Sequence, residues 1–174
     1  AIGKRTTAWM LNEELTRRGY SSVFVGTGQT AWMLGADYGV VMDAMINDFV
    51  AGGIEHEVVR AWRECRPDFI VIEGQGSMLH PAYPGGFEIM AAARPDWVIL
   101  QDAPGRAHLD GFPDEPFVPV SRYIALIEGF YSARILSITL NTEGVEEAEV
   151  PELVRRYETD FGLPVDAPLA TGVK

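Results

Sequence analysis

The stretch FIVIEGQGS, residues 69–77, joins four consecutive apolar residues to a polar, glycine-rich turn. A short uninterrupted apolar run is typical of a central parallel strand that is buried on both faces. Strand-like and helical stretches alternate along the rest of the chain, with glycine and polar clusters between them. This alternation predicts repeated βα units around a mainly parallel sheet, and therefore an α/β fold.

Apolar periodicity predicts the individual elements. We expect strands over 22–25, 69–72, 97–100 and 135–140, helices over 4–18, 122–131 and 150–161, and a short strand or tail over 164–174. Residues 43–63 predict one long helix, or two helices that meet at Gly52 and Gly53. Polar side chains follow the carboxyl ends of the strands, where open parallel sheets bind ligands. These side chains are candidates for one shared crevice: Thr27, Gln29, Glu73, Gln75, Asp102 and Asn141.

Composition limits the classes of partner. The chain has 174 residues, enough for one domain with a single core, and its net charge of -11 repels nucleic acid and anionic membranes. No stretch is long and uncharged enough to span a bilayer. We therefore expect a small-molecule substrate, and neither nucleic acid nor a membrane as a partner. We also expect a cytoplasmic location, in keeping with the single cysteine, and a homo-oligomer. The tryptophans and methionines, such as Trp9, Met10, Trp32 and Met33, are expected in the core rather than at a subunit interface.

Cysteine and histidine content argues against a metal site. Cys65 is the single cysteine, which excludes an internal disulfide, and its place in an amphipathic helix predicts partial burial. The three histidines, His56, His80 and His108, have no spacing typical of zinc ligands. We expect no metal in the site.

The tetrapeptide GKRT, residues 3–6, is similar to the second half of a Walker A loop, in which backbone amides and a lysine bind phosphates at a helix N-terminus. An ordinary helix start would look the same, because such a short motif arises easily by chance. Arg5 stands where the magnesium-binding hydroxyl normally follows the lysine, and Thr6 comes one place late. This order favours an anion site in which Lys4 and Arg5 both meet a pyrophosphate.

Other strand-end residues have candidate roles beside ordinary ones. Glu73 comes directly after its strand, and its carboxylate could lie near a reacting group, or it could be a solvated residue of an ordinary turn. His80 follows it closely and suits a general base, or a histidine hydrogen-bonded within its loop. Asn141 could hydrogen-bond the edge of a purine, or it could be an ordinary turn residue. Arg106 could bind a substrate carboxylate, or it could be an exposed loop arginine. Asp43 and Asp48 suit a helix start and carry little functional weight.

Several stretches together resemble one family: AIGKRTT at 1–7, GTGQT at 26–30, DFVAG at 48–52, IEGQGS at 72–77 with HPAY at 80–83, and LNT at 140–142. The resemblance is to the P-loop domain of the D-glutamate N-acetyltransferase family, long catalogued as a domain of unknown function and similar to dethiobiotin synthetase. It covers almost the whole chain. It implies a P-loop three-layer sandwich over 1–174, from which the first strand, the start of the P-loop and an N-terminal α/β domain are missing.

The resemblance also implies an activity, acetyl-CoA-dependent N-acetylation of D-glutamate or a related amino acid. Residues expected at the cofactor are Gly3, Lys4, Arg5, Thr6, Thr7 and Asn141, and those expected at the substrate are Gln29, Gln75, Ser77 and Arg106. Acyl transfer needs a base for the amine, and Glu73 and His80 are the candidates.

Two other functions fit the same residues. One is an ATP- and Mg-dependent ligase or kinase of the dethiobiotin synthetase type, against which Arg5 argues. The other is a nucleotide-binding domain without chemistry of its own, against which the polar strand ends argue.

Overall fold

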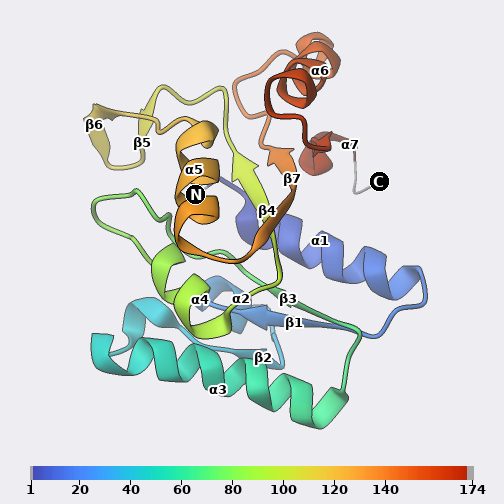
Figure 1. Ribbon diagram of the computed structural model, residues 1–174, viewed down its shortest axis with the longest axis vertical. Coiled ribbons are helices and arrows are strands. Elements are labelled where there is room, and N and C mark those ends of the chain that lie inside the picture. Colours follow the sequence, from blue (N-terminus) through green and yellow to red (C-terminus); the bar gives the residue numbers. More distant parts are fainter. Residues whose placement is uncertain (1, 172–174) are drawn as a thin grey trace. The chain divides into compact units, whose positions relative to one another are not determined.

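The computed structural model describes residues 2–171, and the chain divides into two compact units. We call residues 4–94 the N-terminal unit, and residues 95–174 with residues 1–3 the C-terminal unit. Each unit contains a three-stranded parallel sheet with helices (Figure 1). The predicted α/β class with parallel strands is confirmed.

The N-terminal unit alternates helices and strands. Its elements are α1 (Lys4–Arg17), β1 (Ser22–Gly26), α2 (Gln29–Met33), β2 (Tyr38–Gly39), the 3-10 helix η1 (Met42–Ala44), α3 (Asn47–Cys65), β3 (Phe69–Ile72) and α4 (Gly86–Ala93). The strand order is β2-β1-β3. Helices α1 and α3 cover opposite faces of this sheet (Figure 1). The predicted helix over 4–18 and the strands over 22–25 and 69–72 are confirmed.

Helix α3 is continuous through Gly52 and Gly53, so the first of the two predicted alternatives, one long helix, is confirmed. A Cβ on Gly53 would lie 2.8 Å from Cε of Met45, whereas one on Gly52 would meet nothing within 4 Å. Gly53 therefore allows Met45 to approach the helix closely. The helix ends at Cys65, and the residue that follows, Arg66, has a left-handed φ of 46°. The predicted start at Asp43 belongs instead to η1.

Strand β3 differs from its prediction as a central strand. Among the described strands it pairs with β1 only, and all four of its residues are half-buried. The apolar run FIVI was sufficient to predict a strand, but sequence alone does not say how many neighbours a strand has. Strand β3 is thus an edge of its sheet.

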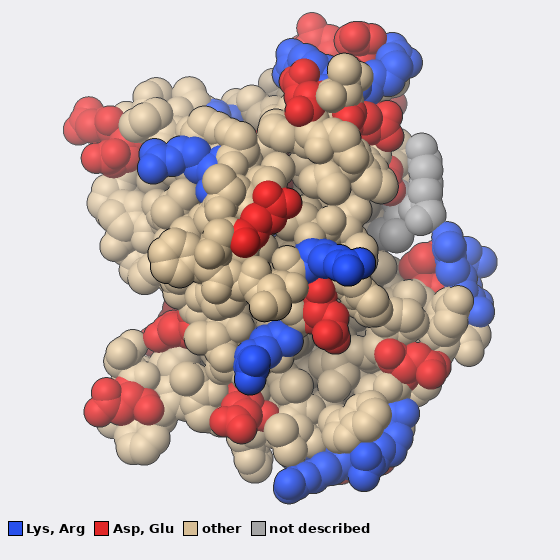
Figure 2. All heavy atoms as spheres, in the orientation of Figure 1, with Lys and Arg blue, Asp and Glu red and all other residues tan. Residues whose placement is uncertain are grey.

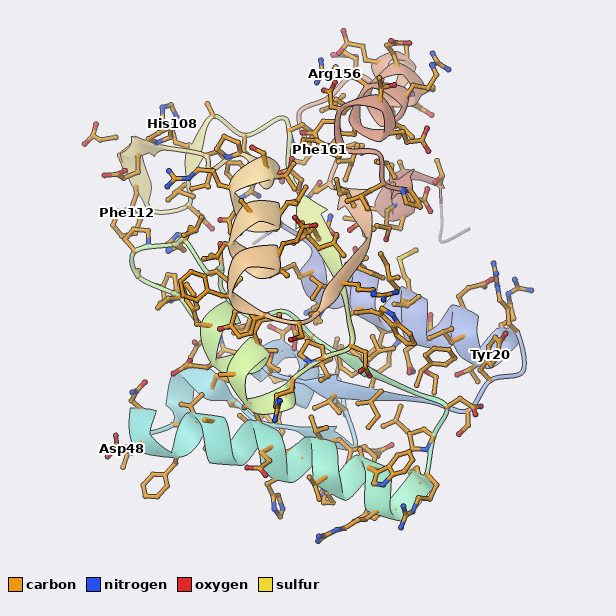
Figure 3. All side chains as sticks on the ribbon, viewed as in Figure 1. Tyr20, Asp48, His108, Phe112, Arg156 and Phe161 are labelled. Carbon is orange, nitrogen blue, oxygen red and sulfur yellow. The ribbon has the colours of Figure 1, made fainter. Side chains whose placement is uncertain are left out.

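The C-terminal unit has its own sheet of order β4-β7-β8. Its elements are β4 (Trp97–Asp102), β5 (His108–Leu109), β6 (Phe112–Pro116), α5 (Val120–Phe130), β7 (Arg134–Leu140), the 3-10 helix η2 (Glu147–Glu149), α6 (Val150–Phe161), β8 (Val165–Asp166) and α7 (Pro168–Thr171). Strands β5 and β6 form an antiparallel hairpin that carries His108 and Phe112 (Figure 3). The predicted strands over 97–100 and 135–140 and the predicted helices over 122–131 and 150–161 are confirmed. Within the short strand or tail predicted over 164–174, the structure has the strand β8 and then the helix α7, which was not predicted, and residues 172–174 lie outside the described part.

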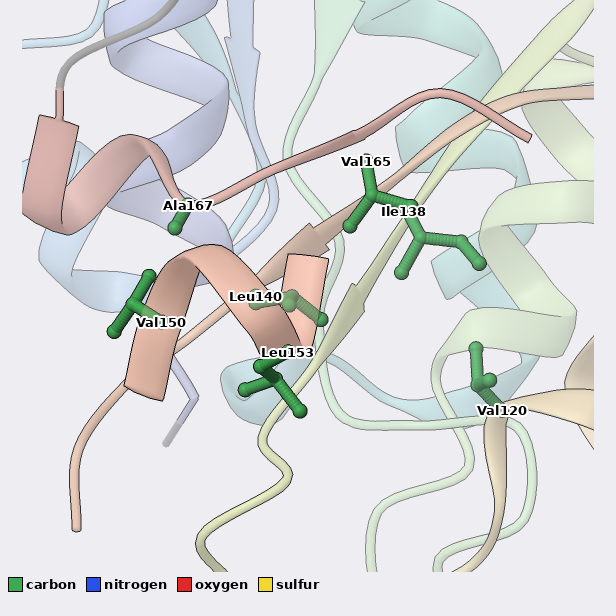
Figure 4. Packing of buried hydrophobic residues seen from close by; sticks show 7 residues of the cluster. All are labelled: Val120, Ile138, Leu140, Val150, Leu153, Val165 and Ala167. Atoms are coloured by element: carbon green, nitrogen blue, oxygen red, sulfur yellow. The ribbon is translucent and has the colours of Figure 1, made fainter. Parts of the chain in front are cut away.

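The core of the C-terminal unit lies around β7. Ile138 and Leu140 are fully buried and pack with Val120 of α5 and Leu153 of α6 (Figure 4). Val165 of strand β8, which pairs with β7 at Ile138, belongs to the same cluster. Burying side chains of this size stabilises a fold by roughly 1.5–3 kcal/mol each. The β7 strand therefore holds α5, α6 and β8 together.

Some predicted burial is wrong. Trp32 and Met33 of α2 are 68% and 74% exposed, although we expected them in the core. Helix α2 has only five residues and buries Ala31 alone, so its large side chains remain outside. Cys65, expected to be partly buried, is exposed as the last residue of α3.

The surface view in Figure 2 shows acidic and basic side chains interspersed over the face that it presents. Within residues 2–171, the structure contains no helix both long and apolar enough to cross a membrane.

Candidate functional site

In the N-terminal unit, the start of α1 lies beside the loop that follows β3. A Cβ built on Gly74 would be 3.1 Å from Cδ and 3.5 Å from Cε of Lys4. The aliphatic part of the lysine therefore crosses the glycine in contact with its backbone. Gly74 leaves the space that this lysine occupies, as expected for a glycine at a close approach.

Glu73 ties the end of β3 to the end of β1. Its Oε2 accepts hydrogen bonds from the backbone amides of Thr27, at 2.9 Å, and Gly28, at 3.2 Å, while the Thr27 hydroxyl donates to the Glu73 carbonyl at 3.0 Å. Glu73 is 4% exposed and Thr27 is completely buried. Bonds from amides to a carboxylate are stronger than neutral ones, so this carboxylate fixes both loops.

Gln75 is held between two other loops. Its Nε2 donates to Oδ2 of Asp43 at 2.9 Å. A Cβ on Gly28 would lie 2.9 Å from the Gln75 Oε1. Because a carboxylate can only accept, Asp43 sets the amide orientation and leaves the carbonyl oxygen of Gln75 against the β1 loop. Asp43, which sequence reasoning gave little weight, is thus part of the site.

Ser77 and His80 shape the next turn of the same loop. The Ser77 amide donates to the Tyr83 carbonyl at 2.8 Å, and the Ala82 amide donates to Nδ1 of His80 at 3.2 Å. In a neutral ring with Nδ1 as acceptor, the proton is on Nε2. The His80 ring also lies 5.3 Å from that of Tyr83. This geometry is that of a histidine bonded within its loop.

The remaining predicted residues of this unit have different environments. Thr7 is buried, Lys4 and Arg5 are half-buried, and Thr6 is exposed. Gln29, the first residue of α2, is also exposed. The structure thus brings together the start of α1, the β1 loop and the β3 loop within one unit.

In the C-terminal unit, Asn141 fastens the first residues of the chain to β7. Its Nδ2 donates to the Ile2 carbonyl at 3.1 Å, and its Oδ1 accepts from the Glu143 amide at 2.9 Å. Gly3 has a left-handed φ of 90°, and a Cβ there would lie 2.8 Å from Leu169. Asn141 therefore has the turn geometry that was one of its two predicted interpretations.

Asp102 lies at the end of β4 next to Asn141, whose amide donates to the Asp102 carbonyl at 2.8 Å. The buried Asp102 carboxylate accepts a 2.7 Å hydrogen bond from the Tyr157 hydroxyl. Burial, together with this bond, raises the pKa of Tyr157. Tyr157 comes from α6, and sequence reasoning missed it because its partner is 55 residues away.

Arg106 pairs with Glu143 across the loops that follow β4 and β7. Its Nη2 is 2.9 Å from the Glu143 Oε2, and the arginine side chain is 25% exposed while that of Glu143 is 69% exposed. Gly105 allows these loops to meet, since a Cβ there would lie 2.3 Å from the Glu143 carbonyl oxygen. A substrate carboxylate at Arg106 would compete with an acid already in place.

The start of α1 has the properties of an anion site. The helix has 14 residues, carries no acid in its first turn, and begins with Lys4 and Arg5. The first amides of a helix have no carbonyl partner within the helix, and its dipole favours negative charge there. The residues present therefore fit the phosphates of a nucleotide-type cofactor. Among residues 2–171, no group of three or more His, Cys, Asp or Glu side chains could hold a metal ion.

Comparisons with known proteins show the family of this chain. Residues 1–174 match the family described as "Domain of unknown function (DUF1611_C) P-loop domain". A D-glutamate N-acetyltransferase from Tritonibacter scottomollicae is 34% identical over 183 residues, covering 99% of this chain and 52% of its own length. One from a Pseudoalteromonas species is 28% identical over 179 residues, covering 99% and 53%.

The chain is also similar to a solved structure, the crystal structure of a DUF1611 family protein from Anabaena variabilis ATCC 29413. The TM-score is 0.90 at 32% identity, covering 99% of this chain and 51% of that one. The chain thus spans about half the length of each of these proteins. From its first residue to its last, the chain belongs to the DUF1611 P-loop domain family.

Proposed function

We propose that this chain is the P-loop portion of an acetyl-CoA-dependent N-acetyltransferase that acts on D-glutamate or a related amino acid. The relatives' names support an N-acetyltransferase. The contact of Lys4 with Gly74 supports a cofactor site next to the Glu73 loop, because it brings a cationic side chain from the start of α1 to that loop. This contact is the observation that carries the proposal.

In this proposal, the first amides of α1 hold the cofactor phosphates with Lys4 and Arg5. Acetyl-CoA, when bound, supplies the activated acyl group. Glu73 accepts the proton that leaves the substrate amine, and it does so through Oε1, since Oε2 already accepts two amides. The carbonyl oxygen of Gln75, oriented by Asp43, accepts an N–H of the same amine.

His80 is the weaker of the two candidate bases. Its Nδ1 already accepts the proton of the Ala82 amide, so this nitrogen is engaged within the loop. Removing a proton from substrate would first require the bond to Ala82 to break. We therefore assign His80 to the shape of the loop.

We further propose that the active protein has about the length of its relatives, with this chain as its C-terminal P-loop domain. The half-buried apolar edge strand β3 supports this, because such a strand is typical of a sheet that continues. Assays should therefore use a chain extended to the relatives' length.

The test is acetyl transfer followed by mass spectrometry of the product. We expect an acetylated product from D-glutamate and acetyl-CoA without added ATP, and a strong loss of product in Lys4→Ala. Arg63→Ala, an exposed cation of α3, is the matched control and should react like the wild type. Product formation that needs Mg-ATP, or equal turnover in Lys4→Ala, would contradict the proposal.

A further inference from the structure

A cavity in the N-terminal unit lies away from the strand ends described above. It measures about 580 Å³, within the usual size range of small-molecule pockets. It lies beside the first half of β1, at Ser22 to Phe24, where β2 is too short to reach, because β2 pairs only with Val25 and Gly26. Helices α1 and α3 supply walls.

The apolar walls of this cavity are largely aromatic. Trp9 of α1 and Phe24 of β1 line it, with ring centroids 5.0 Å apart at an angle of 61°. Tyr38 adds a third ring and is 8% exposed. The Tyr38 hydroxyl donates to Oε2 of Glu64 at 2.8 Å and contacts the Cys65 sulfur at 3.1 Å. These two contacts, that with Cys65 foremost, raise the pKa of Tyr38, so the ring stays neutral.

The charge of the lining is negative. Asp37 and Glu64 contribute two carboxylates, while Arg60 is the cation among the lining residues. The Arg60 charge is already matched by Glu57, whose Oε2 is 2.9 Å from its Nη2, and its guanidinium lies 4.7 Å from the centre of the Tyr38 ring. The carboxylates therefore remain as excess charge, in a protein whose net charge is -11.

We propose that this cavity binds a small organic cation with an apolar body, such as an aryl-alkylamine. Carboxylates attract an ammonium group, and aromatic rings offer a large apolar area for the body of such a ligand. Glu64, fixed by the Tyr38 hydroxyl, accepts the ammonium protons, while Trp9 and Phe24 cover the apolar body. The site is independent of the proposed acetyl transfer, because its residues lie at the other end of β1 from Thr27 and Gly28.

Three probes of similar size and different charge test this site: tyramine, 4-ethylphenol and (4-hydroxyphenyl)acetate. Their affinities for the whole chain are measured by calorimetry at low salt. We expect tyramine to bind about fivefold tighter than the other two, which corresponds to about 1 kcal/mol, the upper end of the range for an exposed ion pair such as that of the ammonium with Glu64. Glu64→Gln, which keeps an acceptor for Tyr38, should remove this preference.

Glu152→Gln is the matched control, since it removes one exposed carboxylate from α6 in the other unit and should leave the preference unchanged. Equal affinity for the three probes, no binding of any probe, or a preference that survives Glu64→Gln would each overturn the inference. Acetyl transfer should be the same with and without tyramine, so failure here is distinguishable from failure of the proposed function.

Discussion

At the residue scale, the candidate site depends on close contacts that glycines permit. Gly74 faces the stem of Lys4 and Gly28 faces the amide of Gln75. In both places a methyl group would come closer than ordinary van der Waals contact. The glycines of GTGQT and EGQG thus set where the candidate residues Lys4 and Gln75 lie.

Substituting Gly74 by Ala tests the position of Lys4. The added Cβ at 3.1 Å should push the lysine stem aside and weaken acetyl-CoA binding several-fold, with little change in stability because the stem is flexible. Calorimetry and thermal unfolding measure the two effects. Gly129→Ala, in open space on α5, should change neither affinity nor site geometry. Unchanged affinity in Gly74→Ala would show that the lysine does not act from this position.

Glu73→Gln separates the two tasks of the carboxylate. Glutamine can still accept from Thr27 and Gly28, but without charge, so we expect a loss of about 1–2 kcal/mol in unfolding free energy. Acetyl transfer should fall by roughly 10²–10⁴, the usual contribution of a general base. Denaturant titration and initial rates measure these changes. A stable variant with wild-type rates would exclude Glu73 as the base.

At the element scale, the course of helix α3 depends both on the helix propensity of its residues and on packing against its neighbours. Helix α3 continues through two adjacent glycines, although each costs a helix interior about 1 kcal/mol relative to Ala. Burial of Val50, Ile54 and Ala61 along one face offsets that cost. Tertiary packing therefore decides between the two predicted alternatives and favours one long helix over two helices that meet at the glycines.

The two glycines of α3 give a matched pair of variants. Gly52→Ala should stabilise the protein by roughly 0.5–1 kcal/mol, because its Cβ meets nothing within 4 Å. Gly53→Ala should gain less or lose stability, since Met45 lies 2.8 Å from the new Cβ. Chemical denaturation of both variants checks this order. A larger gain for Gly53→Ala would contradict the packing described for Met45.

Strand β7 offers a similar pair in the C-terminal unit. Leu140→Ala should destabilise by roughly 2–5 kcal/mol, as usual for a fully buried leucine. Leu136→Ala, on the same strand but 45% exposed, should cost clearly less. Hydrogen exchange along β7 together with urea titration measures both. Equal losses would mean that Leu140 is not at the centre of this core.

At the scale of the whole molecule, sequence predicted the long elements and missed the short ones. Strands such as 69–72 and helices such as 150–161 have apolar patterns that few other secondary structures would produce. Strand β2 has two residues and α2 has five, too few for any period to be visible. The edge position of β3 was not predictable for another reason, because it depends on which other strands pair with it.

The site was predictable to a similar extent. Parallel topology made it possible to expect Glu73, Gln75 and Asn141 at strand ends. The partners of these residues were not predictable, because Asp43 is 32 residues from Gln75 and Ile2 is 139 residues from Asn141. Which polar residue binds a ligand and which binds a neighbouring loop is decided by such long-range pairs.

Cofactor binding by the start of α1 is tested most directly by calorimetric titration of acetyl-CoA into the chain extended to its relatives' length. We predict that acetyl-CoA binds, that Lys4→Ala weakens it at least about tenfold, or 1.4 kcal/mol, and that Arg63→Ala does not. We also predict that Mg-ATP does not displace acetyl-CoA. Equal affinity in Lys4→Ala, or tighter binding of Mg-ATP than of acetyl-CoA, would contradict the proposed cofactor site.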